Sequence, residues 1–582
     1  MKLLLCLIFL GVALGDLTSA HSSTTSNRGP REPPHPGLWV LKLKDRVDPN
    51  EIAASHDLSY EGPLEKMDHF HLFKMKTGGR KRDHAHVETA LEEDSQITLF
   101  EAQHAKRRFK KDMRHIVDPL YSRQWHLHNN IRCDIRADSA WSTRTGKGVN
   151  IAIVDDGVQW RHPDLNDRYK AALSKDLNEG DLDPTPTRDD GHGTSAAGAA
   201  LASSNNVCGV GVAPEAGLVG IRLIAEPVAD YEEAQGLSYK NNQIHIYSSS
   251  WGPYDDASSL EGPGTVTKEM FQMEAVNGRN GLGSIWVWAG GNGRDNGDNC
   301  NYDGYASSRY TLAIGALDHR ERQAWYSESC AALIACAPSS GAPGYGITTT
   351  DLLGSAGYTP GDCTNSFGGT SAAAPIAAGA IALILEERPD LTWRDVQHVI
   401  AKSSRQVDAS NPDWNVNERG FHHSHKYGFG VMDTNKMIRV AKEHQLVPKK
   451  QKMCTTGRIQ SLKPIGDNGV WQNVPTVLPS FRCRGENREI SFVEHVELTV
   501  YITHPKRGDV SVHLTGPDAT ISIMAEKHHD IHRNYPRKGW TFTSMRHFGS
   551  SMEGPWTIRL KDNTRDRHSG RLEWYELKVY GY

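Results

Sequence analysis

The sequence lacks most features that mark nucleic-acid-binding, zinc-binding or membrane-spanning proteins. Its formal net charge is only -4 over 582 residues, which argues against a nucleic-acid binder or a protein that coats a membrane. It contains no zinc or EF-hand spacing, no Asn-x-Ser/Thr acceptor for N-glycosylation and, after residue 15, no apolar run that we expect to cross a bilayer. A chain of this length instead predicts several globular domains with ample core.

The first 15 residues form a distinct segment. Lys2 precedes an apolar stretch at residues 3–14, and Ala13-x-Gly15 is a small-x-small cleavage pattern. This is typical of a secretory signal peptide and is too short for a membrane span. Nine cysteines are present, and Cys6 falls in this segment, which leaves eight. We therefore expect a soluble lumenal or extracellular protein in an oxidising compartment.

Three short motifs place an acid, a base and a nucleophile in a fixed order. Asp155 lies in Ile-Val-Asp-Asp-Gly, His192 in Gly-His-Gly-Thr and Ser371 in Gly-Gly-Thr-Ser-Ala-Ala-Ala-Pro. This order is that of subtilisin and differs from those of chymotrypsin and the α/β-hydrolases. A serine hydroxyl needs a base within hydrogen-bond reach, and that base needs an orienting carboxylate. Each motif alone is more often a turn or a helix cap, but their conjunction predicts a serine endopeptidase.

The residues around these motifs predict where each side chain stands. The β-branched run at residues 149–154 predicts a buried parallel strand that ends at Asp155. Residues 372–387 are rich in Ala, Ile and Leu and predict a helix with Ser371 at its N-terminus, where free N–H groups favour an oxyanion. Asn292 is the candidate side-chain donor to that oxyanion, although beside its glycines it could equally be a turn residue.

Five further stretches resemble the kexin- and furin-type proprotein convertases, which are calcium-dependent, subtilisin-like processing proteases. They are Ser250-Trp-Gly-Pro253, Cys300-Asn-Tyr-Asp-Gly304, Trp325-Tyr-Ser-Glu328, Leu391-Thr-Trp-Arg-Asp-Val396 and Tyr427-Gly-Phe-Gly430. Residues 420–425 and 502–508 are most similar to type-seven convertases. The resemblance implies an α/β catalytic domain with a parallel sheet flanked by helices, an α+β prodomain and an all-β jelly-roll P domain.

The resemblance also implies the domain boundaries. It predicts a signal peptide, an inhibitory prodomain, a subtilisin-like catalytic domain and a P domain at residues 1–15, 16–111, 112–447 and 448–582. The last domain has independent support, because apolar and polar residues alternate at residues 496–503 with the period of a strand. Within it, Arg507-Gly-Asp509 invites an integrin interpretation, but a turn between strands explains it better.

Basic motifs in the prodomain predict where the protein cuts itself. Residues 106–111 end in Lys111, so that the primary cut precedes Asp112. Lysine offers a point charge where relatives present the bidentate fork of arginine, which predicts slower self-cleavage. Arg82 ends the candidate for a second cut that releases the inhibitory segment. By the resemblance, mild acid triggers that cut, with His69 and His71 as the candidate proton switch.

A protease that selects paired basic residues needs carboxylates in its cleft, because a buried cation requires a charged partner. The resemblance assigns six carboxylates, in pairs that face the first, second and fourth residues before the cut: Asp255 with Asp303, Asp156 with Asp189, and Glu233 with Glu261. Solvated surface positions are the alternative, above all for Glu233 and Glu261.

Calcium is the cofactor that the resemblance implies, in three sites: Asp176, Asp181 and Asp183; Asp255, Asp298 and Glu328; and Asp118, Asp164 and Asn206. The first set also suggests an ion-stapled loop from its acidic residues alone. The loop of the third set is one residue shorter than in furin, so its carbonyl ligands are expected to shift. His422, His423 and His425 are interpreted as a structural turn and not as metal ligands.

The resemblance pairs Cys208 with Cys363, Cys300 with Cys330, and Cys454 with Cys483. Cys133 and Cys336 are left over, either paired with each other or present as buried thiols. The expected protein is a monomer, in the secretory pathway (Golgi or trans-Golgi lumen) or secreted. It is inhibited by its own prodomain and cleaves precursor proteins at Arg-x-Lys/Arg-Arg sites. One alternative is a broad degradative subtilisin. The other is a catalytically silent binding or chaperone protein, and the presence of all four catalytic residues disfavours this second alternative.

Overall fold

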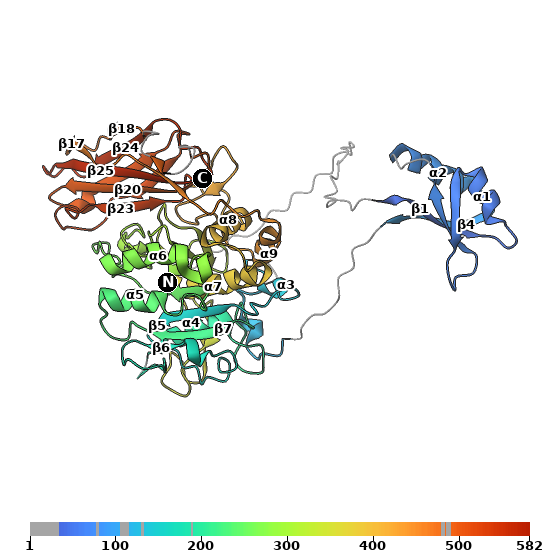
Figure 1. Ribbon diagram of the computed structural model, residues 1–582, viewed down its shortest axis with the longest axis horizontal. Coiled ribbons are helices and arrows are strands. Elements are labelled where there is room, and N and C mark those ends of the chain that lie inside the picture. The colour runs from blue at the N-terminus through green and yellow to red at the C-terminus, as the bar shows by residue number, and fades with distance from the viewer. Residues whose placement is uncertain are drawn as a thin grey trace, which may run out of the picture. The chain divides into compact units, whose positions relative to one another are not determined.

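The computed structural model describes residues 34–76, 81–104, 116–129, 133–187, 190–478, 483–484 and 490–582. It divides into two compact units, residues 1–112 and 113–582 (Figure 1). The predicted signal peptide lies outside the described residues.

The first unit is a four-stranded antiparallel sheet with two helices. Its strands are β1 (Pro34–Leu43), β2 (Leu58–Pro63), β3 (Phe70–Met75) and β4 (Ile97–His104), in the order β2-β3-β1-β4, and its helices are α1 (Pro49–Ser55) and α2 (Lys81–Glu93). Trp39, Leu41, Ile52 and Phe73 form the centre of its small core. This confirms the α+β fold expected for the prodomain.

A seven-stranded parallel sheet is the frame of the second unit. It consists of β5 (Asn150–Asp155), β6 (Lys175–Asp176), β7 (Gly217–Arg222), β8 (Ile246–Ser249), β9 (Ile285–Ala289), β10 (Thr311–Leu317) and β11 (Ala335–Pro338), in the order β11-β10-β9-β8-β5-β7-β6. Nearly all of their residues are buried, as expected for parallel strands covered on both faces. The carboxyl ends of these strands therefore meet at one edge, where ligands commonly bind.

Helices flank this sheet (Figure 1). They are α3 (Ala137–Ala140), α4 (His192–Leu201), α5 (Asp230–Ser238), α6 (Thr265–Gly281), α7 (Thr370–Glu387), α8 (Trp393–Ser403) and α9 (Thr434–Glu443). Trp286 of β9 shows how α5 and α6 are anchored: its Nε1 donates to the Leu237 carbonyl at 2.9 Å, and the Phe271 ring meets it edge-on. Two small hairpins, β12 (Ile347–Thr350) with β13 (Cys363–Phe367) and β14 (Asn415–Val416) with β15 (His422–His423), complete this part.

Helix α7 packs against five strands of the sheet, β5 and β8 to β11. Among the described residues, α7 is the helix that is long and apolar enough to cross a membrane. Of its 18-residue apolar stretch, 83% is buried inside the protein. The expectation that no segment after the signal peptide reaches this threshold was therefore wrong. The physical reason is that the Ala, Ile and Leu residues of a central core helix have the composition of a membrane span.

The C-terminal part is a sandwich of two antiparallel sheets. Its strands are β16 (Lys452–Thr455), β17 (Ile459–Ile465), β18 (Gln472–Thr476), β19 (Cys483–Arg484), β20 (Val493–Thr503), β21 (Val510–Thr515), β22 (Ile521–Ala525), β23 (Trp540–Ser544), β24 (Trp556–Asp562) and β25 (Gly570–Gly581). One sheet has the order β19-β16-β25-β20-β23, with β17 also paired to β25, and the other β18-β24-β21-β22. Val496, Leu498, Val500 and Ile502 face the core, which confirms the predicted alternation and the all-β fold.

A buried charge cluster joins the sandwich to the α/β part. The Arg394 guanidinium of α8 binds both oxygens of Glu494, at 2.8 and 2.9 Å, and His398 Nε2 lies 2.9 Å from Glu494 Oε1. Burial raises the pKa of Glu494, but the bonds and charges of His398 and Arg394 outweigh it and lower that pKa to about 2. The carboxylate is therefore charged, and its partners hold the two parts in a fixed register.

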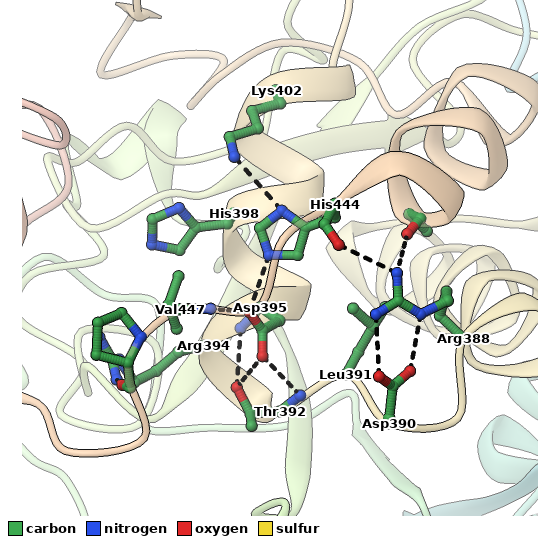
Figure 2. Close-up of polar contacts among 12 residues, drawn as sticks. Arg388, Asp390, Leu391, Thr392, Arg394, Asp395, His398, Lys402, His444 and Val447 are labelled. Atoms are coloured by element: carbon green, nitrogen blue, oxygen red, sulfur yellow. Dashed lines mark hydrogen bonds and ion pairs between the residues drawn. The ribbon is translucent and has the colours of Figure 1, made fainter.

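Asp395, the neighbour of Arg394, anchors the segment between α9 and the sandwich (Figure 2). Its Oδ1 binds His444 Nε2 at 2.8 Å and accepts from the Val447 N–H at 2.8 Å. Its Oδ2 accepts from Thr392, which makes it part of the N-terminal cap of α8. One carboxylate thus stabilises a helix end and fixes the connection to the next domain.

The predicted disulfides form, and both Cys336 and the Arg507-Gly-Asp509 motif have structural positions. The bonds Cys208–Cys363, Cys300–Cys330 and Cys454–Cys483 form as the resemblance implied. Cys336 is buried on β11, where burial raises the pKa of its thiol. Arg507-Gly-Asp509 forms a 3-10 turn, and Arg507 binds Asp530 and the Ser258 carbonyl, so this motif contributes to the domain contact.

The three histidines at 422–425 have separate hydrogen-bond partners. His422 and His423 bond to the carbonyls of Phe429 and Leu333, and His425 bonds to Asp413. They support local structure, as predicted.

Candidate active site

The predicted acid and base come from two adjoining elements. Asp155 is the last residue of β5, and His192 is the first residue of α4. His192 Nδ1 lies 2.9 Å from Asp155 Oδ1, which leaves Nε2 as the acceptor for a hydroxyl proton. A Cβ on Gly193 would lie 2.2 Å from the Gly157 carbonyl oxygen, so only glycine lets the helix start this close to the strand end.

Asp156 holds the beginning of α4 in place. Its carboxylate accepts from the N–H groups of His192, at 3.1 Å, and Gly193, at 2.8 Å. Burial and the charge of Asp155 raise the pKa of Asp156 to about 7. Burial lowers the pKa of His192, but the charge and hydrogen bond of Asp155 outweigh it and raise that pKa above its usual value. The site therefore stabilises an imidazolium, which is the state that a general base passes through.

Ser371 lies in the first turn of α7. Gly369, at the N-cap, has a φ of 73°, a conformation that favours glycine. The Ser371 hydroxyl donates to the Ser250 carbonyl at 3.3 Å, and the Ser250 hydroxyl donates back to the Ser371 carbonyl at 3.0 Å. Phe367, shortly before Ser371, meets the His192 ring edge-on at 5.5 Å. The nucleophile segment and the base are thus packed against each other through Phe367.

Asn292 follows β9 and has a fixed amide orientation. Its Oδ1 accepts from Thr370 N at 2.8 Å and from Thr370 Oγ1 at 3.0 Å. Since a backbone N–H requires an acceptor, the amide Nδ2 faces the other way. A Cβ on Gly369 would lie 3.3 Å from Asn292 Oδ1 and 3.6 Å from both Asn292 Nδ2 and Ser371 N, so the Asn292 amide and the Ser371 N–H lie close to each other beside the nucleophile. This arrangement can stabilise an oxyanion.

An acidic cluster lies directly behind the oxyanion loop. One carboxylate oxygen each from Asp255, Asp298 and Glu328 lies within 4.8 Å of the others. Asp255 Oδ2 accepts from Asn292 N at 2.7 Å, and Glu328 Oε1 accepts from Gly293 N at 2.8 Å. The cluster therefore supports the backbone that carries the candidate oxyanion donor.

No Lys or Arg of the described residues forms an ion pair with this cluster, although the charge of His528 opposes the rise in the pKa of Asp298. Burial and mutual repulsion raise the pKa of Asp298 to about 6 and that of Glu328 well above its usual value. A cavity of about 10 Å³ borders the three carboxylates and Asp303, which is close to the space of one water molecule. Oxygen ligands of this kind in a confined space fit a calcium ion.

Three of the predicted substrate carboxylates lie around Tyr305. Asp303 Oδ1 accepts from Tyr305 N at 2.6 Å, and burial raises the pKa of Asp303 to about 8. The Tyr305 hydroxyl donates to Glu233 Oε2 at 2.6 Å. Glu261 is exposed and its backbone pairs with that of Asp303. The sequence analysis did not single out Tyr305. This residue directly follows the motif Cys300-Asn-Tyr-Asp-Gly304, and that position is the signal that could have identified it. Asp189 lies outside the described residues.

The structure gathers Asp118 and Asp164, but with Asn205 instead of Asn206. Asn205 N donates to Asp118 Oδ1 at 3.0 Å and Asn205 Nδ2 to Asp164 Oδ1 at 2.9 Å, whereas Asn206 is exposed. Asp164 Oδ2 is buried without a hydrogen-bond partner, and burial raises the pKa of Asp164 to about 8. This oxygen, which has no hydrogen-bond partner, is suited to bind a cation.

The sequence does not indicate which of the two adjacent asparagines turns inward, because only the loop conformation decides it.

The loop at residues 176–183 does not gather its three carboxylates. Asp176 binds Arg222 Nη1 at 2.9 Å, and Asp183 Oδ1 accepts from Trp160 Nε1 at 2.7 Å. Asp181 Oδ1 accepts from Asp183 N within the loop. In this conformation each carboxylate has its own protein partner, so the predicted three-carboxylate site is not formed.

The predicted self-cleavage sites have little described structure. Lys111 and Asp112 lie outside the described residues. Arg82 belongs to the first turn of α2, so a cut there requires that turn to unwind into an extended strand. In the same unit, Tyr60 Oη lies 3.0 Å from His71 Nδ1, and burial together with the charge of His69 lowers the pKa of His71.

Comparison with known proteins finds three family models along the chain. The Subtilase family matches residues 146–430, the Proprotein convertase P-domain residues 493–579 and the Peptidase S8 pro-domain residues 38–111. The dibasic-processing endoprotease of Schizosaccharomyces pombe is 35% identical over 94% of this chain and 78% of its own length, and proprotein convertase subtilisin/kexin type 4 of Mus musculus is 38% identical over 84% and 74%. The chain belongs to the kexin- and furin-type proprotein convertases.

Other convertases and solved structures extend this placement. Human proprotein convertase subtilisin/kexin type 6 is 37% identical over 95% of this chain, and this convertase chain spans 58% of that relative's length. The crystal structure of the serine protease of Aeromonas sobria has a TM-score of 0.71 and 24% identity, covering 80% of this chain and 96% of that one. That likeness shows the fold. The type-seven subtype stays a prediction.

Proposed function

We propose that this convertase is a serine endopeptidase that cleaves precursor proteins after paired basic residues. The observation that carries the proposal is the Asp155–His192 pair, at 2.9 Å, placed at a strand end beside the helix start that carries Ser371. The carboxylates that surround Tyr305 support the preference for basic substrates.

The residues act in a defined sequence. His192 Nε2 takes the proton from Ser371 Oγ as Oγ attacks the scissile carbonyl carbon, and the carbonyl oxygen becomes an oxyanion. Asn292 Nδ2 and Ser371 N donate to that oxyanion. His192 then gives its proton to the leaving amine as the C–N bond breaks, and water hydrolyses the acyl-enzyme by the same route. Asp155 holds the imidazole and stabilises its charge throughout.

Substrate selection follows from the carboxylates. Asp303 and Asp255 would contact the basic residue before the cut, and Asp156 with Asp189 the residue before it. Glu233 and Glu261 would contact a basic residue four positions back. Because burial raises the pKa of Asp303 to about 8 in the empty cleft, a bound arginine or lysine is expected to restore its charge and to release a proton.

Calcium would be held by Asp255, Asp298 and Glu328, and a second ion by Asp118 and Asp164 with an amide from the 205–206 pair. The ion would supply positive charge that offsets carboxylate repulsion behind the oxyanion loop. The three carboxylates themselves position that loop through Asn292 N and Gly293 N.

The prodomain would act as an intramolecular inhibitor until cuts after Lys111 and Arg82. His71 supports an acid trigger, because its lowered pKa means that protonation destabilises the folded prodomain as pH falls. The site of action would be the Golgi lumen or beyond, consistent with the three disulfides, with the enzyme as a monomer.

The test is hydrolysis of matched peptides. We expect an Arg-x-Lys-Arg peptide to be cleaved and a peptide with alanine at the basic positions to be cleaved far more slowly, with loss of activity on chelation and recovery with Ca²⁺. Equal hydrolysis of both peptides would indicate a degradative subtilisin and contradict the proposed specificity. No hydrolysis in the presence of Ca²⁺ by the fully processed enzyme would contradict the proposed chemistry.

A further inference from the structure

A cavity of about 860 Å³ lies where the α/β part meets the sandwich. Its walls come from the start of α6, from the segment that precedes β10, and from β20, β23 and β25. This volume falls within the range of about 300–1,000 Å³ that is usual for small-ligand sites. None of the candidate catalytic residues lines it, although Glu261, one of the candidate substrate carboxylates, does.

One wall of the cavity is built by Arg309. Its guanidinium lies between the rings of Tyr310 and Tyr580, at 4.0 and 4.1 Å from their centroids. Nη1 donates to Gln451 Oε1 at 2.8 Å, and Nε lies 3.6 Å from Glu497 Oε1. Because these partners come from both parts of the unit and the connection between them, the wall is formed before any ligand arrives.

Two other cations of the cavity have no such partners. Lys268 comes from α6 and Lys538 from the segment before β23, and neither ammonium forms an ion pair or hydrogen bond with a residue that the structure describes. Burial and the charge of Lys538 lower the pKa of Lys268. Lys578 differs, since its ammonium lies 3.3 Å from Glu576. An anion between Lys268 and Lys538 would relieve their repulsion.

The acidic groups near these lysines, Asp230 and Glu497, already have protein partners. Asp230 acts on Lys268, but its carboxylate accepts from the N–H groups of Val266, at 2.8 Å, and Thr267, at 3.0 Å. Glu497 accepts from the Tyr580 hydroxyl at 2.8 Å and faces Arg309.

Glu261 is the remaining acidic residue of the lining, and it is exposed. Arg309 faces Glu497, and Lys578 pairs with Glu576, so Lys268 and Lys538 are the cations of the lining that remain, with Glu261 as the remaining carboxylate. The lining carries an excess of positive charge.

The same cavity presents flat rings and short hydroxyls. Trp540 is fixed by the bond from its Nε1 to the Asn301 carbonyl at 2.8 Å, and Tyr310 lies on the opposite domain. Thr499 and Thr541 bring two hydroxyl groups, which bond to each other at 2.8 Å. Aromatic faces with a few placed polar groups suit a ring that carries hydroxyls.

We propose that this cavity binds a small anionic ligand, a sulfate or phosphate ester carried on a sugar-like ring, with the ester group between Lys268 and Lys538. The ring lies against Trp540 and Tyr310. Residues 260–264 form part of the cavity wall, and Gly304 N, next to Asp303, donates to the Glu261 carbonyl at 2.8 Å. A ligand bound in this cavity therefore changes the KM for peptides with a basic residue four positions before the cut. This last step rests on the proposed function.

The binding test uses the full processed chain, isothermal titration calorimetry and constant ionic strength. The ligands are glucose 6-sulfate, glucose 6-phosphate and glucose. We expect at least one ester to bind and glucose to bind no better than background. Lys268→Gln and Lys538→Gln should each weaken ester binding by about tenfold, because each removes one charged donor to the ester group. Lys147→Gln and Lys561→Gln, which remove one positive charge outside the cavity from each part, should bind as the wild type does.

Glucose 6-sulfate and glucose 6-phosphate distinguish a sulfate ester from a phosphate ester. The ester that binds more tightly identifies the anionic group that the cavity prefers. If neither ester binds more tightly than glucose, or if both cavity variants bind as the wild type does, the proposal is wrong. The KM of a peptide with and without the ester tests the link to the cleft, and an unchanged KM refutes that link. A chain that binds the ester but hydrolyses no peptide would count against the proposed function and not against this site.

Discussion

The parallel sheet and the antiparallel sandwich use charge in opposite ways. At the edge of the parallel sheet, Asp156, Asp298 and Asp303 are buried among other carboxylates, which raises their pKa values. At the sandwich contact, Glu494 is buried against Arg394 and His398, which lower its pKa to about 2. The first arrangement is poised to receive a cation, while the second is already satisfied. Binding sites and structural contacts can therefore be told apart by whether their buried charges are balanced.

The largest expected effect breaks the chemistry of the parallel sheet alone. Ser371→Ala should lower kcat by about 10⁶-fold, as removal of a triad nucleophile does, and leave the zymogen uncut. Ser366→Ala, a nearby exposed serine, should process itself and turn over normally. Prodomain removal on gels and peptide hydrolysis measure both effects, and self-processing by Ser371→Ala would refute the nucleophile assignment.

Glu494→Ala breaks the satisfied cluster instead. It should destabilise the second unit by about 3–5 kcal/mol, since it leaves Arg394 and His398 buried without their carboxylate. Glu573→Ala removes a carboxylate that pairs with the more exposed Arg571 and should change stability little. Chemical denaturation measures the difference, and equal stabilities would show that the junction does not hold the two parts together.

Asn292→Ala should lower kcat by about 10²–10³-fold with little change in KM, because the lost donor acts on the oxyanion. The Thr370 bonds to Asn292 make a change in position of α7 the competing explanation. Thr370→Val removes only the side-chain part of that contact and should cost much less. A larger loss in Thr370→Val than in Asn292→Ala would assign Asn292 a structural role.

The smallest effect concerns pH in the chelated enzyme. The raised folded pKa values, about 6 for Asp298 and about 8 for Asp303, mean that the folded state holds protons that the unfolded state has released. The contribution of these two carboxyls to stability should therefore be present at acid pH and fall as pH rises from about 4 to 8. Added Ca²⁺ should flatten that slope. Thermal melts of the wild type, Asp298→Asn and Asp303→Asn under chelation at several pH values test it. The wild type should lose more stability than either variant as pH rises, and parallel pH profiles would contradict the assignment of an unbalanced acidic cluster.

Much of the site could be predicted because its signals are local. The apolar run before Asp155 and the Ala-rich run after Ser371 specify a strand end and a helix start, and both elements form where predicted. The alternation at residues 496–503 likewise specifies a strand with one buried face.

Two of the predicted calcium sets look different in the structure because of partners that are distant in the sequence. Asp176 binds Arg222 of β7, and Asn205 turns inward where Asn206 was expected. Neither the type nor the spacing of these residues indicates which partner Asp176 binds or which of the two asparagines turns inward.

The sequence by itself determined which elements form and which residues carry chemistry, because periodicity, glycine positions and motif order act within a few residues of each other. Only the tertiary structure decided which charges are balanced. Lys268 and Lys538 meet across one cavity, and Arg394 meets Glu494, although each pair is far apart along the chain. The energy of a charge depends on its burial and on its nearest neighbours, and folding brings these together from separate parts of the chain.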